Sequence, residues 1–570
     1  MPFTPPTAEQ RFVLEHVVGM AELASTERFA AATPDLVDAV LEGAGAFAAG
    51  VWAPLARTGD TEGATWTPGG VVMPAGFIQA YRDYVEGGWG TIGVPEQWGG
   101  QGLPFTIQTL VLETLGAANT ALALCPILTL GAIEALQHHG SPAQQAAYLP
   151  RLATGEWTGT MNLTEPQAGS DVGALRAAAT PLGDGTWSIK GTKIFISYGD
   201  HDMAPNIVHL VLARTPGAPE GTRGISLFLV PKFRLDANGE PDALNDVRVV
   251  SIEHKMGLHA SPTCVLSFGD EGDCIGELIG PEHGGMRAMF TMMNNARLNV
   301  GLEGVQVAEA ATQAAVAYAL ERVQSPRAGA ASRESVRIVE HPDVRRMLLR
   351  MKAQTQAARA LVYFAASQVD RAELGQTGAR ERLELMTPLA KTYATDIGNE
   401  VASLGIQVHG GMGYIEETGA AQFFRDARIF PIYEGTNGIQ AADLVGRKLG
   451  LAGGAAFASL IEEMRGEARA ESLAGLIEAC SQIGKELAQA GPDDRLAASY
   501  PFLTMLSTAV CGWLMERQAR AAADDAPGRM KRAASRFYLE QIVPEALGLR
   551  AAATAAAELL YTIAPEEFAA

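Results

Sequence analysis

The sequence predicts an α+β multidomain protein in which a β-rich segment stands between helical segments. Helical patterns fill residues 1–160, and short runs rich in Val, Ile and Phe replace them over 161–280. Helical patterns return over 281–446 and continue over 447–570. Strands that are not interleaved with helices argue against a doubly wound nucleotide-binding fold. We therefore expect four domains with these boundaries.

Composition narrows the class of protein. The 570 residues are 47% hydrophobic and 19% charged, as in ordinary globular proteins, and 44 Lys and Arg against 64 Asp and Glu give a net charge of −20. Because an acidic chain repels phosphate backbones and anionic lipid, we expect no nucleic-acid and no membrane partner. The five cysteines are scattered and lack zinc-ligand spacing, which fits a reducing compartment and predicts no metal site.

Two segments bear on cellular location. Pro, Glu and Gln interrupt the N-terminal residues where a signal peptide needs an apolar run. The most apolar stretch, residues 121–133, is broken by Thr129 and Gly131, and it is too short to span roughly 30 Å of hydrocarbon. We expect a soluble, cytoplasmic protein.

The helical segments show specific helix signals. Ser141, Pro142 and Gln144 form a helix start with a capping box. Long helices with short breaks predict a bundle over 281–446. One buried helix face there is predicted by the i, i+3, i+4, i+7 spacing of Val344, Met347, Leu348 and Met351.

The middle segment contains the predicted strands. A Rossmann interpretation fails, because no GxGxxG follows a strand and the glycines of 410–413 lie in a helical region. The strands are expected at 187–189, 193–197, 207–212, 225–230 and 264–268.

The last segment begins at a glycine-rich boundary, residues 446–454. Residues 451–570 are Ala-rich and helical, with 11 Lys and Arg against 16 Asp and Glu. A basic cluster is interpreted as a solvated helix face; it comprises Arg529, Lys531, Arg532 and Arg536.

Four segments are rich in small residues, polar residues and glycine, a composition that packing of a hydrophobic core does not require. They are 161–171, 193–197, 294–298 with 318–324, and 405–414 with 424–440. Together, in this order and spacing, they resemble the acyl-CoA dehydrogenase family over about residues 50–447. The block after 447 is similar to a large bacterial subgroup that carries a C-terminal helical extension.

The resemblance implies a fold and partners. The fold is an N-terminal helical domain, a middle β-barrel-like domain and a C-terminal helical bundle, followed here by an extra helical domain. It implies FAD as cofactor, acyl-CoA as substrate and an electron-transfer flavoprotein as partner. The extra domain favours a homodimer, because it can cover the surface on which a second dimer docks in tetrameric members.

Glu434, in the run Tyr433-Glu-Gly-Thr436, matches the catalytic base of the family. The α-proton of a thioester is weakly acidic, so its removal needs a placed carboxylate in a dry pocket, where desolvation raises the carboxyl pKa. Gly435 lets the backbone approach the substrate thioester. By resemblance, the β-hydride passes to flavin N5 and leaves a trans-2-enoyl-CoA, a step of fatty acid β-oxidation.

The first two segments match flavin-lining positions of the family. In the second, this chain has Phe-Ile-Ser where the family usually has Trp-Ile-Thr, so an aromatic face and a hydroxyl are kept and an indole donor is lost. Ser170 is also expected near the CoA chain. The residues expected at the cofactor are Met161, Leu163, Thr164, Ser170, Phe195 and Ser197.

The remaining segments match positions that hold phosphate and adenine. Arg297 is expected to help hold CoA, and arginine suits phosphate because its fork donates in pairs. His409 is interpreted as a packed histidine. The residues expected at FAD, in part across a dimer interface, are Arg322, Gln324, Gln407, Gly410, Gly411, Thr436 and Asn437.

Alternatives stay open at this point. A flavin acyl-CoA oxidase, which uses O2, would share these motifs. A nucleic-acid-binding relative is disfavoured by the acidic C-terminal region, and an inactive scaffold by the presence of Glu434. Neither the acyl chain nor the role of residues 447–570 can be read from the sequence.

Overall fold

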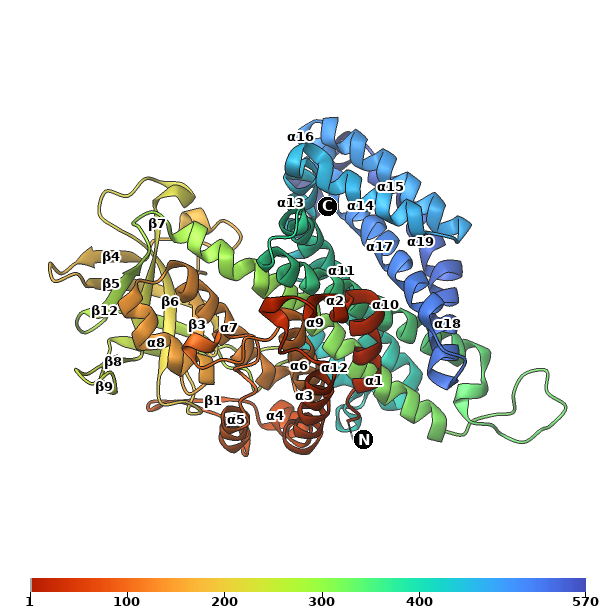
Figure 1. The fold of residues 1–570 in the computed structure, drawn as a ribbon, viewed down its shortest axis with the longest axis horizontal. Coiled ribbons are helices and arrows are strands. Elements are labelled where there is room, and N and C mark those ends of the chain that lie inside the picture. The colour runs from red at the N-terminus through yellow and green to blue at the C-terminus, as the bar shows by residue number, and fades with distance from the viewer. Residues whose placement is uncertain (1–2) are drawn as a thin grey trace. The chain divides into compact units, whose positions relative to one another are not determined.

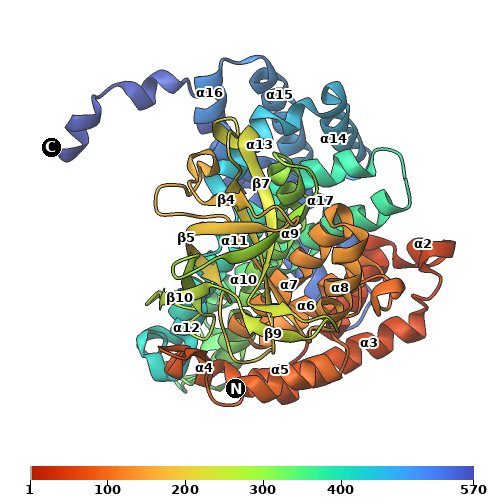
Figure 2. The same ribbon diagram turned by 90° about the vertical axis from the view of Figure 1, so that its left-hand side faces the viewer.

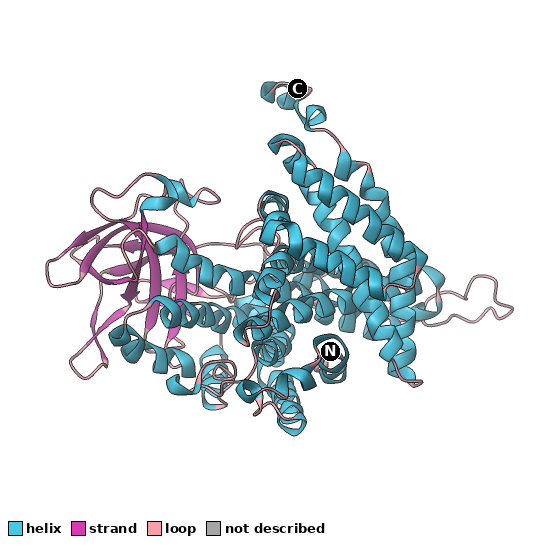
Figure 3. Cartoon of the chain, turned by 45° about the horizontal axis from the view of Figure 1, so that its top comes forward, coloured by secondary structure: helices cyan, strands magenta, loops and turns pink. Residues whose placement is uncertain are grey.

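The computed structural model describes residues 3–570, apart from the side chains of Thr291, Met292 and Asn294. The chain divides into two compact units. The sheet unit comprises Ala39–Ala296, and the bundle unit comprises the described residues up to Asp38 together with Arg297–Ala570. The strands, magenta in Figure 3, all belong to the sheet unit. The predicted α+β class is confirmed.

The main sheet of the sheet unit is mixed, has eight strands and closes on itself. The pairing runs from β5 to β12, β7 and β6, and β4 joins β6 back to β5. This ring agrees with a β-barrel-like middle domain. Its strands are β4 (Ala178–Pro181), β5 (Trp187–Ser197), β6 (Ile207–Arg214), β7 (Ile225–Pro231) and β12 (Cys274–Ile279).

Other strands extend or flank the ring. β3 (Thr158–Asn162) runs parallel to β6, and β11 (Thr263–Phe268) pairs with β5 and with β10 (Val247–Ile252). Two small hairpins are formed by β1 (Thr65–Thr67) with β2 (Gly70–Val72) and by β8 (Phe233–Leu235) with β9 (Pro241–Leu244).

The predicted strands are largely confirmed. Residues 187–189 and 193–197, predicted as two strands, are the two ends of β5. The strands β6, β7 and β11 lie where they were predicted. Strand β3 was missed because its Thr-Gly-Thr-Met-Asn sequence is polar, although all five residues are buried.

The helices of the sheet unit pack beside this sheet (Figure 1). A Cβ on Gly159 of β3 would lie 2.4 Å from Ala132 Cβ, so glycine permits the close approach of α7. The capping box is confirmed, because Ser141 Oγ accepts from Gln144 N and Gln144 Oε1 accepts from Ser141 N. The helices are α4 (Ala56–Glu62), α5 (Phe77–Glu86), α6 (Phe105–Ala118), α7 (Thr120–His139) and α8 (Pro142–Thr154), and α3 (Pro34–Phe47) precedes them.

Three helical runs in the described part of the chain are long and apolar enough to cross a membrane by length and composition alone: Pro34–Glu62, Thr120–His139 and Asn437–Glu467. This corrects the expectation that the apolar stretch at 121–133 is too short, because α7 continues to His139 and has 20 residues. Its most apolar window is 72% buried inside the protein. Packing in the core accounts for the apolar composition of α7.

Three long helices form the bundle: α9 (Gly285–Glu321), α10 (Pro342–Glu373) and α11 (Ala379–His409). A Cβ on Gly304 would lie 2.2 Å from the carbonyl oxygen of Ala394, so α9 and α11 meet backbone to backbone. On α10, the predicted face is confirmed, since Met347, Leu348 and Met351 are buried and Val344 is half-buried. α12 (Ala420–Ala427) and α13 (Asn437–Gly446) follow.

The residues after 447 pack directly on this bundle. Helix α17 (Ser499–Ala521) lies against α10, α11 and α13. The ring of Trp513 on α17 is 5.4 Å from that of Phe364 on α10. The hydroxyls of Tyr393 and Tyr538 are 2.6 Å apart. The added helices, blue in Figure 1, are α14 (Ala455–Glu467), α15 (Glu471–Gln489), α16 (Pro492–Ala497), α17 (Ser499–Ala521), α18 (Ala526–Phe537) and α19 (Val543–Leu547); the short α1 (Thr7–Val13) and α2 (Met20–Ala24) belong to the same unit.

The chain ends in a short arm, residues 555–570. Figure 2 shows it leading away from α16 to the C-terminus as a series of tight turns. Its apolar side chains are exposed, namely Leu559, Leu560, Tyr561, Ile563 and Phe568.

Candidate active site

The loop that carries Glu434 has an unusual backbone. It lies between α12 and α13, and Glu434 and Gly435 both have positive φ, +54° and +85°. A non-glycine residue in this region costs roughly 1–2 kcal/mol, so surrounding contacts must hold it. The Asn437 N–H donates to Pro431 O at 2.9 Å, and Thr436 Oγ1 accepts from Ile439 N as the N-cap of α13.

The Glu434 side chain is half-buried. Burial raises the pKa of Glu434, while the positive charges of Arg297 and Lys391 lower it. A carboxylate in this setting is a stronger base than an exposed one, yet two cations keep its charged form accessible.

A second carboxyl group lies close to Glu434. Glu303 of α9 is 1% exposed and accepts a hydrogen bond from the Tyr433 hydroxyl. Burial raises the pKa of Glu303 to about 8, the Tyr433 hydrogen bond and Lys391 oppose this rise, and the charge of Glu434 adds to it. At neutral pH Glu303 is therefore mostly protonated.

Lys391 of α11 connects this site to α13. Its Nζ donates to Asn437 Oδ1 at 2.8 Å, and the Asn437 Nδ2 donates to Asp396 Oδ1 at 2.8 Å. Burial lowers the pKa of Lys391 to about 8, and Asp396, Glu434 and Glu303 counter this effect. Asn437 is 3% exposed and its amide is hydrogen-bonded within this network, and its contact with the cofactor stays a prediction.

Buried polar atoms beside Gly435 lack hydrogen-bond partners. Neither amide atom of Gln440 has a partner, and the residue is fully buried. The Nε of Arg297 also has none, and burial lowers the pKa of Arg297. A Cβ on Gly435 would lie 2.8 Å from Gln440 Nε2 and 3.6 Å from Arg297 Nη2. Groups of this kind need water or a ligand, which fits a binding surface at this loop.

In the sheet unit, the first two predicted segments come together. Lys193 of β5 is fully buried, and its Nζ donates to Leu163 O at 3.0 Å and to Glu165 Oε1 at 2.8 Å. The Ile194 N–H donates to Thr164 O at 2.9 Å. Met161 lies buried at the end of β3. These contacts fix the 161–171 segment against β5.

Phe195 has the most distinctive placement of these residues. It has φ +60° and its side chain is 59% exposed, although it lies within β5. The pairing of β5 with β11 shifts register here, between Cys264 and Leu266. Bulges can re-aim a side chain, and here the aromatic ring of Phe195 is turned outward. Ser197, half-buried, ends the strand, and Ser170 is exposed.

In the bundle unit, residues that were predicted to hold phosphate come together at the end of α9. Arg322 Nη2 donates to Gln324 Oε1 at 3.2 Å, and both side chains are exposed. One turn earlier, the Tyr318 ring stacks on His409 with centroids 4.4 Å apart, which confirms His409 as a packed histidine. Its neighbours at the end of α11, all exposed, are Gln407, Gly410 and Gly411.

The predicted residues thus form three groups. Glu434, Gly435 and Arg297 lie together, as do the residues of 161–165 with 193–197, and those of 318–324 with 407–411. Sequence reasoning misses the residues that support them, because most of their contacts join segments that are far apart in the sequence, and all but the half-buried Asp396 are buried. They are Glu165, Lys193, Glu303, Lys391, Asp396 and Gln440.

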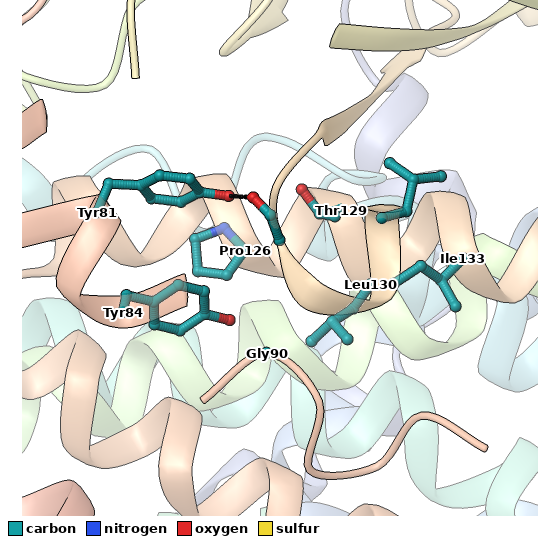
Figure 4. A pocket seen from close by; sticks show the side chains of 9 residues that line it. Tyr81, Tyr84, Gly90, Pro126, Thr129, Leu130 and Ile133 are labelled. Atoms are coloured by element: carbon teal, nitrogen blue, oxygen red, sulfur yellow. Dashed lines mark hydrogen bonds between the residues drawn. The ribbon is translucent and has the colours of Figure 1, made fainter. Parts of the chain in front are cut away.

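A small cavity in the sheet unit is not a candidate for the substrate. Figure 4 shows it between α5 and α7, where Tyr81 donates to Gly155 O at 2.8 Å. Its volume of about 10 Å³ has room for roughly one water molecule. It is lined by Tyr81, Tyr84, Gly90, Pro126, Thr129, Leu130, Ile133, Leu152 and Gly155.

Four family models match the chain in order. The acyl-CoA dehydrogenase N-terminal domain matches residues 37–156, the middle domain 160–270 and the C-terminal domain 283–449. A fourth, described as acetyl-CoA dehydrogenase C-terminal like, matches 455–564.

Whole proteins agree with these matches. The chain is 44% identical over 546 residues to 3-methylmercaptopropionyl-CoA dehydrogenase of Ruegeria pomeroyi, covering 92% of each chain. The fold matches Caenorhabditis elegans ACDH-11 in complex with C11-CoA, with a TM-score of 0.77 at 22% identity over 95% of this chain and 92% of that one. A structure described as the electron transferring flavoprotein of Acidaminococcus fermentans matches with a TM-score of 0.60 at 28% identity, over 72% of this chain and 97% of that one. The chain therefore belongs to the acyl-CoA dehydrogenase family of FAD-dependent oxidoreductases.

Proposed function

We propose that this protein removes the α-proton and the β-hydride of an acyl-CoA thioester to give a trans-2-enoyl-CoA, with Glu434 as the base. The observation that carries this proposal is the loop of Glu434 and Gly435, where both residues have positive φ and Gly435 lies beside Gln440 and Arg297, whose buried polar atoms lack partners. Backbone strain of this kind costs free energy, and it is found mostly at functional sites, where surrounding contacts hold it. Arg297 and Lys391 are the cations that lower the pKa of Glu434 against the effect of burial.

The residues present fit FAD. Phe195 offers an exposed ring to a planar group. Arg322 makes no ion pair in the described part of the chain, and a Cβ on Gly410 or Gly411 would meet no atom within 4 Å, so both suit a pyrophosphate. When bound, FAD supplies the acceptor for the hydride that leaves the substrate β-carbon.

The protein side of the reaction is a proton transfer. The Glu434 carboxylate takes the proton from the substrate α-carbon, and the electron pair of that C–H bond moves toward the thioester carbonyl. We infer that the Glu434 backbone N–H donates to that carbonyl oxygen, where negative charge develops. Gly435 leaves room for the thioester beside the loop, and Arg297 stabilises the nearby negative charge.

Replacement of Glu434 tests the base. Glu434→Gln should bind FAD with the normal yellow spectrum yet lose anaerobic bleaching by acyl-CoA by roughly 100- to 10,000-fold. The wild-type bleaching rate should rise with pH through a pKa above 4.5, because burial raises the Glu434 pKa. Glu462→Gln, on the exposed face of α14, is the matched control and should behave as wild type. Bleaching by Glu434→Gln at the wild-type rate would refute the assignment.

The substrate and the electron acceptor are further proposals. The name of the Ruegeria pomeroyi relative supports a methylthio-acyl-CoA substrate, and a panel of short, medium, long and methylthio-acyl-CoAs against flavin bleaching ranks them. The Acidaminococcus fermentans match supports an electron-transfer flavoprotein as acceptor. Stoichiometric O2 consumption by the reduced enzyme would favour an oxidase instead.

We also propose a cytoplasmic homodimer of four-domain chains, with boundaries near 160, 280 and 446, acting in fatty acid β-oxidation. Exposed apolar side chains beside Gly410 and Gly411 support the dimer, because a second copy would bury them; they are Met412, Tyr414 and Ile415. Light scattering at micromolar concentration measures the mass, and a monomer would refute the dimer.

Nucleic-acid binding gains no support from the basic cluster on α18. Lys531 is 4% exposed and pairs with Glu9, Arg532 pairs with Asp524, and Arg536 pairs with Glu540. Cations already paired with carboxylates are poor phosphate ligands. Absence of nucleic-acid and membrane partners stays a prediction.

A further inference from the structure

The added helical region reaches the catalytic loop through a polar side chain. Tyr500 lies in the first turn of α17, and its hydroxyl donates to Asp396 Oδ2 of α11 at 2.7 Å. The other oxygen of Asp396, Oδ1, accepts from Asn437 Nδ2 at 2.8 Å. Asn437 is the first residue of α13, three positions after Glu434. Helices α17 and α13 are also in contact, so the path from Tyr500 through Asp396 to Asn437 is short.

The Asn437 amide has a fixed orientation because both of its ends are used. Its Oδ1 accepts from Lys391 Nζ, so its Nδ2 faces Asp396 and the hydroxyl of Thr395. If Asp396 turned away, Asn437 would lose its charged acceptor. Lys391 would then lose a fixed partner, and Lys391 is one of the two cations that stabilise the Glu434 carboxylate.

Asp396 depends on its partners to stay in place. Burial raises its pKa, while the hydrogen bonds of Tyr500 and Asn437 and the charges of Lys391 and Arg428 lower it. Removing the Tyr500 hydroxyl takes away one hydrogen bond to a carboxylate that is largely surrounded by protein. Hydrogen bonds to charged groups are stronger than neutral ones.

We propose that Tyr500 is a positioning residue for the Glu434 base, acting through Asp396, Asn437 and Lys391. The helical region after 447 thereby completes the polar network behind the catalytic loop. This inference rests on the proposed function, because it assigns Tyr500 a role only if Glu434 is the base.

Tyr500→Phe tests the proposal in the full-length holoenzyme. Tyr500 is 37% exposed, so the variant should fold and bind FAD. Anaerobic bleaching at saturating acyl-CoA should slow by roughly three- to tenfold with little change in KM, because positioning of the base affects the chemical step. Tyr561→Phe, which removes an exposed hydroxyl from the C-terminal arm, is the matched control and should match wild type.

A second readout isolates proton removal. An acyl-CoA analogue with oxygen or sulfur at the β-position can lose its α-proton and has no β-hydride to give. Its exchange of α-hydrogen for deuterium from D2O should slow in Tyr500→Phe by the same factor as bleaching. Unchanged exchange would show that Tyr500 does not act on the base and would overturn the proposal.

Two further variants separate positioning from domain docking. Glu545→Gln weakens the pairing of α19 with Arg350, and it should lower Tm without slowing bleaching. Asp396→Asn should slow bleaching itself, and adding Tyr500→Phe to it should cause no further loss. Independent, multiplicative losses in the double variant would refute the path through Asp396. Failure of the proposed function is distinguishable, because it would show as undiminished bleaching in Glu434→Gln.

Discussion

Glu303 shows how one buried carboxyl group can set the pH behaviour of the site. Its partner Tyr433 is 130 residues away in sequence, and Glu434 and Lys391 lie close enough to influence its charge. A protonated Glu303 hydrogen-bonds Tyr433 without adding a second negative charge beside the base. A carboxyl group that stays neutral beside another carboxyl group avoids the repulsion between two like charges.

Replacing Glu303 tests this arrangement through stability. Its pKa is raised from 4.5 to about 8 in the folded protein. The folded state therefore keeps a proton that the unfolded state has released, so the stabilisation present below pH 4.5 is lost as pH rises through about 8. Glu303→Gln should remove this loss. The free energy of unfolding of the holoenzyme variant, relative to wild type, should therefore increase by on the order of a few kcal/mol from pH 4 to pH 9.

Urea unfolding at several pH values measures the difference between the two proteins. Glu462→Gln, an exposed replacement, should show no such pH-dependent gain. A Glu303→Gln stability curve parallel to wild type across this range would mean that Glu303 has an ordinary pKa in the folded protein.

At the level of single residues, the sequence predicts residues that stand in short local motifs, and it does not predict contacts between distant residues. Glu434 and Gly435 stand in a short motif that resembles one of the family, and His409 stands where the family requires no role, so all three could be interpreted in advance. Lys391 meets its partner Asn437 46 residues away, and Tyr500 meets Asp396 104 residues away. Contacts of this kind depend on how helices cross, which no local pattern reports.

At the level of elements, the crossing of α9 and α11 places Glu303 and Lys391 near the loop that carries Glu434. Gly304 and Gly398 face each other here, and a Cβ on Gly398 would lie 2.9 Å from Gly304 O. Two glycines let the helix backbones touch, which brings the side chains of both helices to one face of the crossing.

Gly304→Ala should therefore destabilise the protein and disturb the site together. Its Cβ would lie 2.2 Å from the Ala394 carbonyl oxygen, so the helices must separate, at a cost of about 1–3 kcal/mol. Denaturant unfolding and bleaching rate measure the two effects. Gly475→Ala, at an exposed position of α15 with no atom near the new Cβ, should instead stabilise by about 0.5–1 kcal/mol. Equal stability changes in both variants would contradict the close crossing.

The strands show which elements a sequence pattern can predict and which it cannot. β6 and β7 were predicted because their residues are continuously apolar, as buried strands are. β3 is equally buried, but its Thr158 and Thr160 hydroxyls bond to His201 and His209, so its polar residues are satisfied inside the unit. The bulge at Phe195 likewise follows from pairing with β11, and the run Lys193–Ser197 alone predicts a plain strand.

At the level of the whole molecule, the region after 447 is part of the bundle core. Trp513, Leu514 and Val510 of α17 are fully buried, and Cys511 Sγ approaches Ala357 O of α10 at 3.6 Å. The Acidaminococcus fermentans match covers 97% of its chain with 72% of this one, so a related fold exists on a shorter chain. In this protein, however, the faces of α10 and α11 toward α17 carry apolar residues such as Phe364.

Ending the chain at Gly454 should therefore abolish soluble holoenzyme. The cut would expose Phe364, Tyr393 and the apolar face of α10, a patch of the kind that drives aggregation. Soluble yield, FAD content and dye binding to exposed apolar surface measure the outcome. Removing only residues 559–570, whose apolar side chains are already exposed, should keep FAD binding and the bleaching rate within about twofold. A soluble, fully loaded enzyme ending at Gly454 would show that the bundle folds without the added helices, and bleaching by that enzyme at the wild-type rate would show that the path from Tyr500 to Glu434 is dispensable.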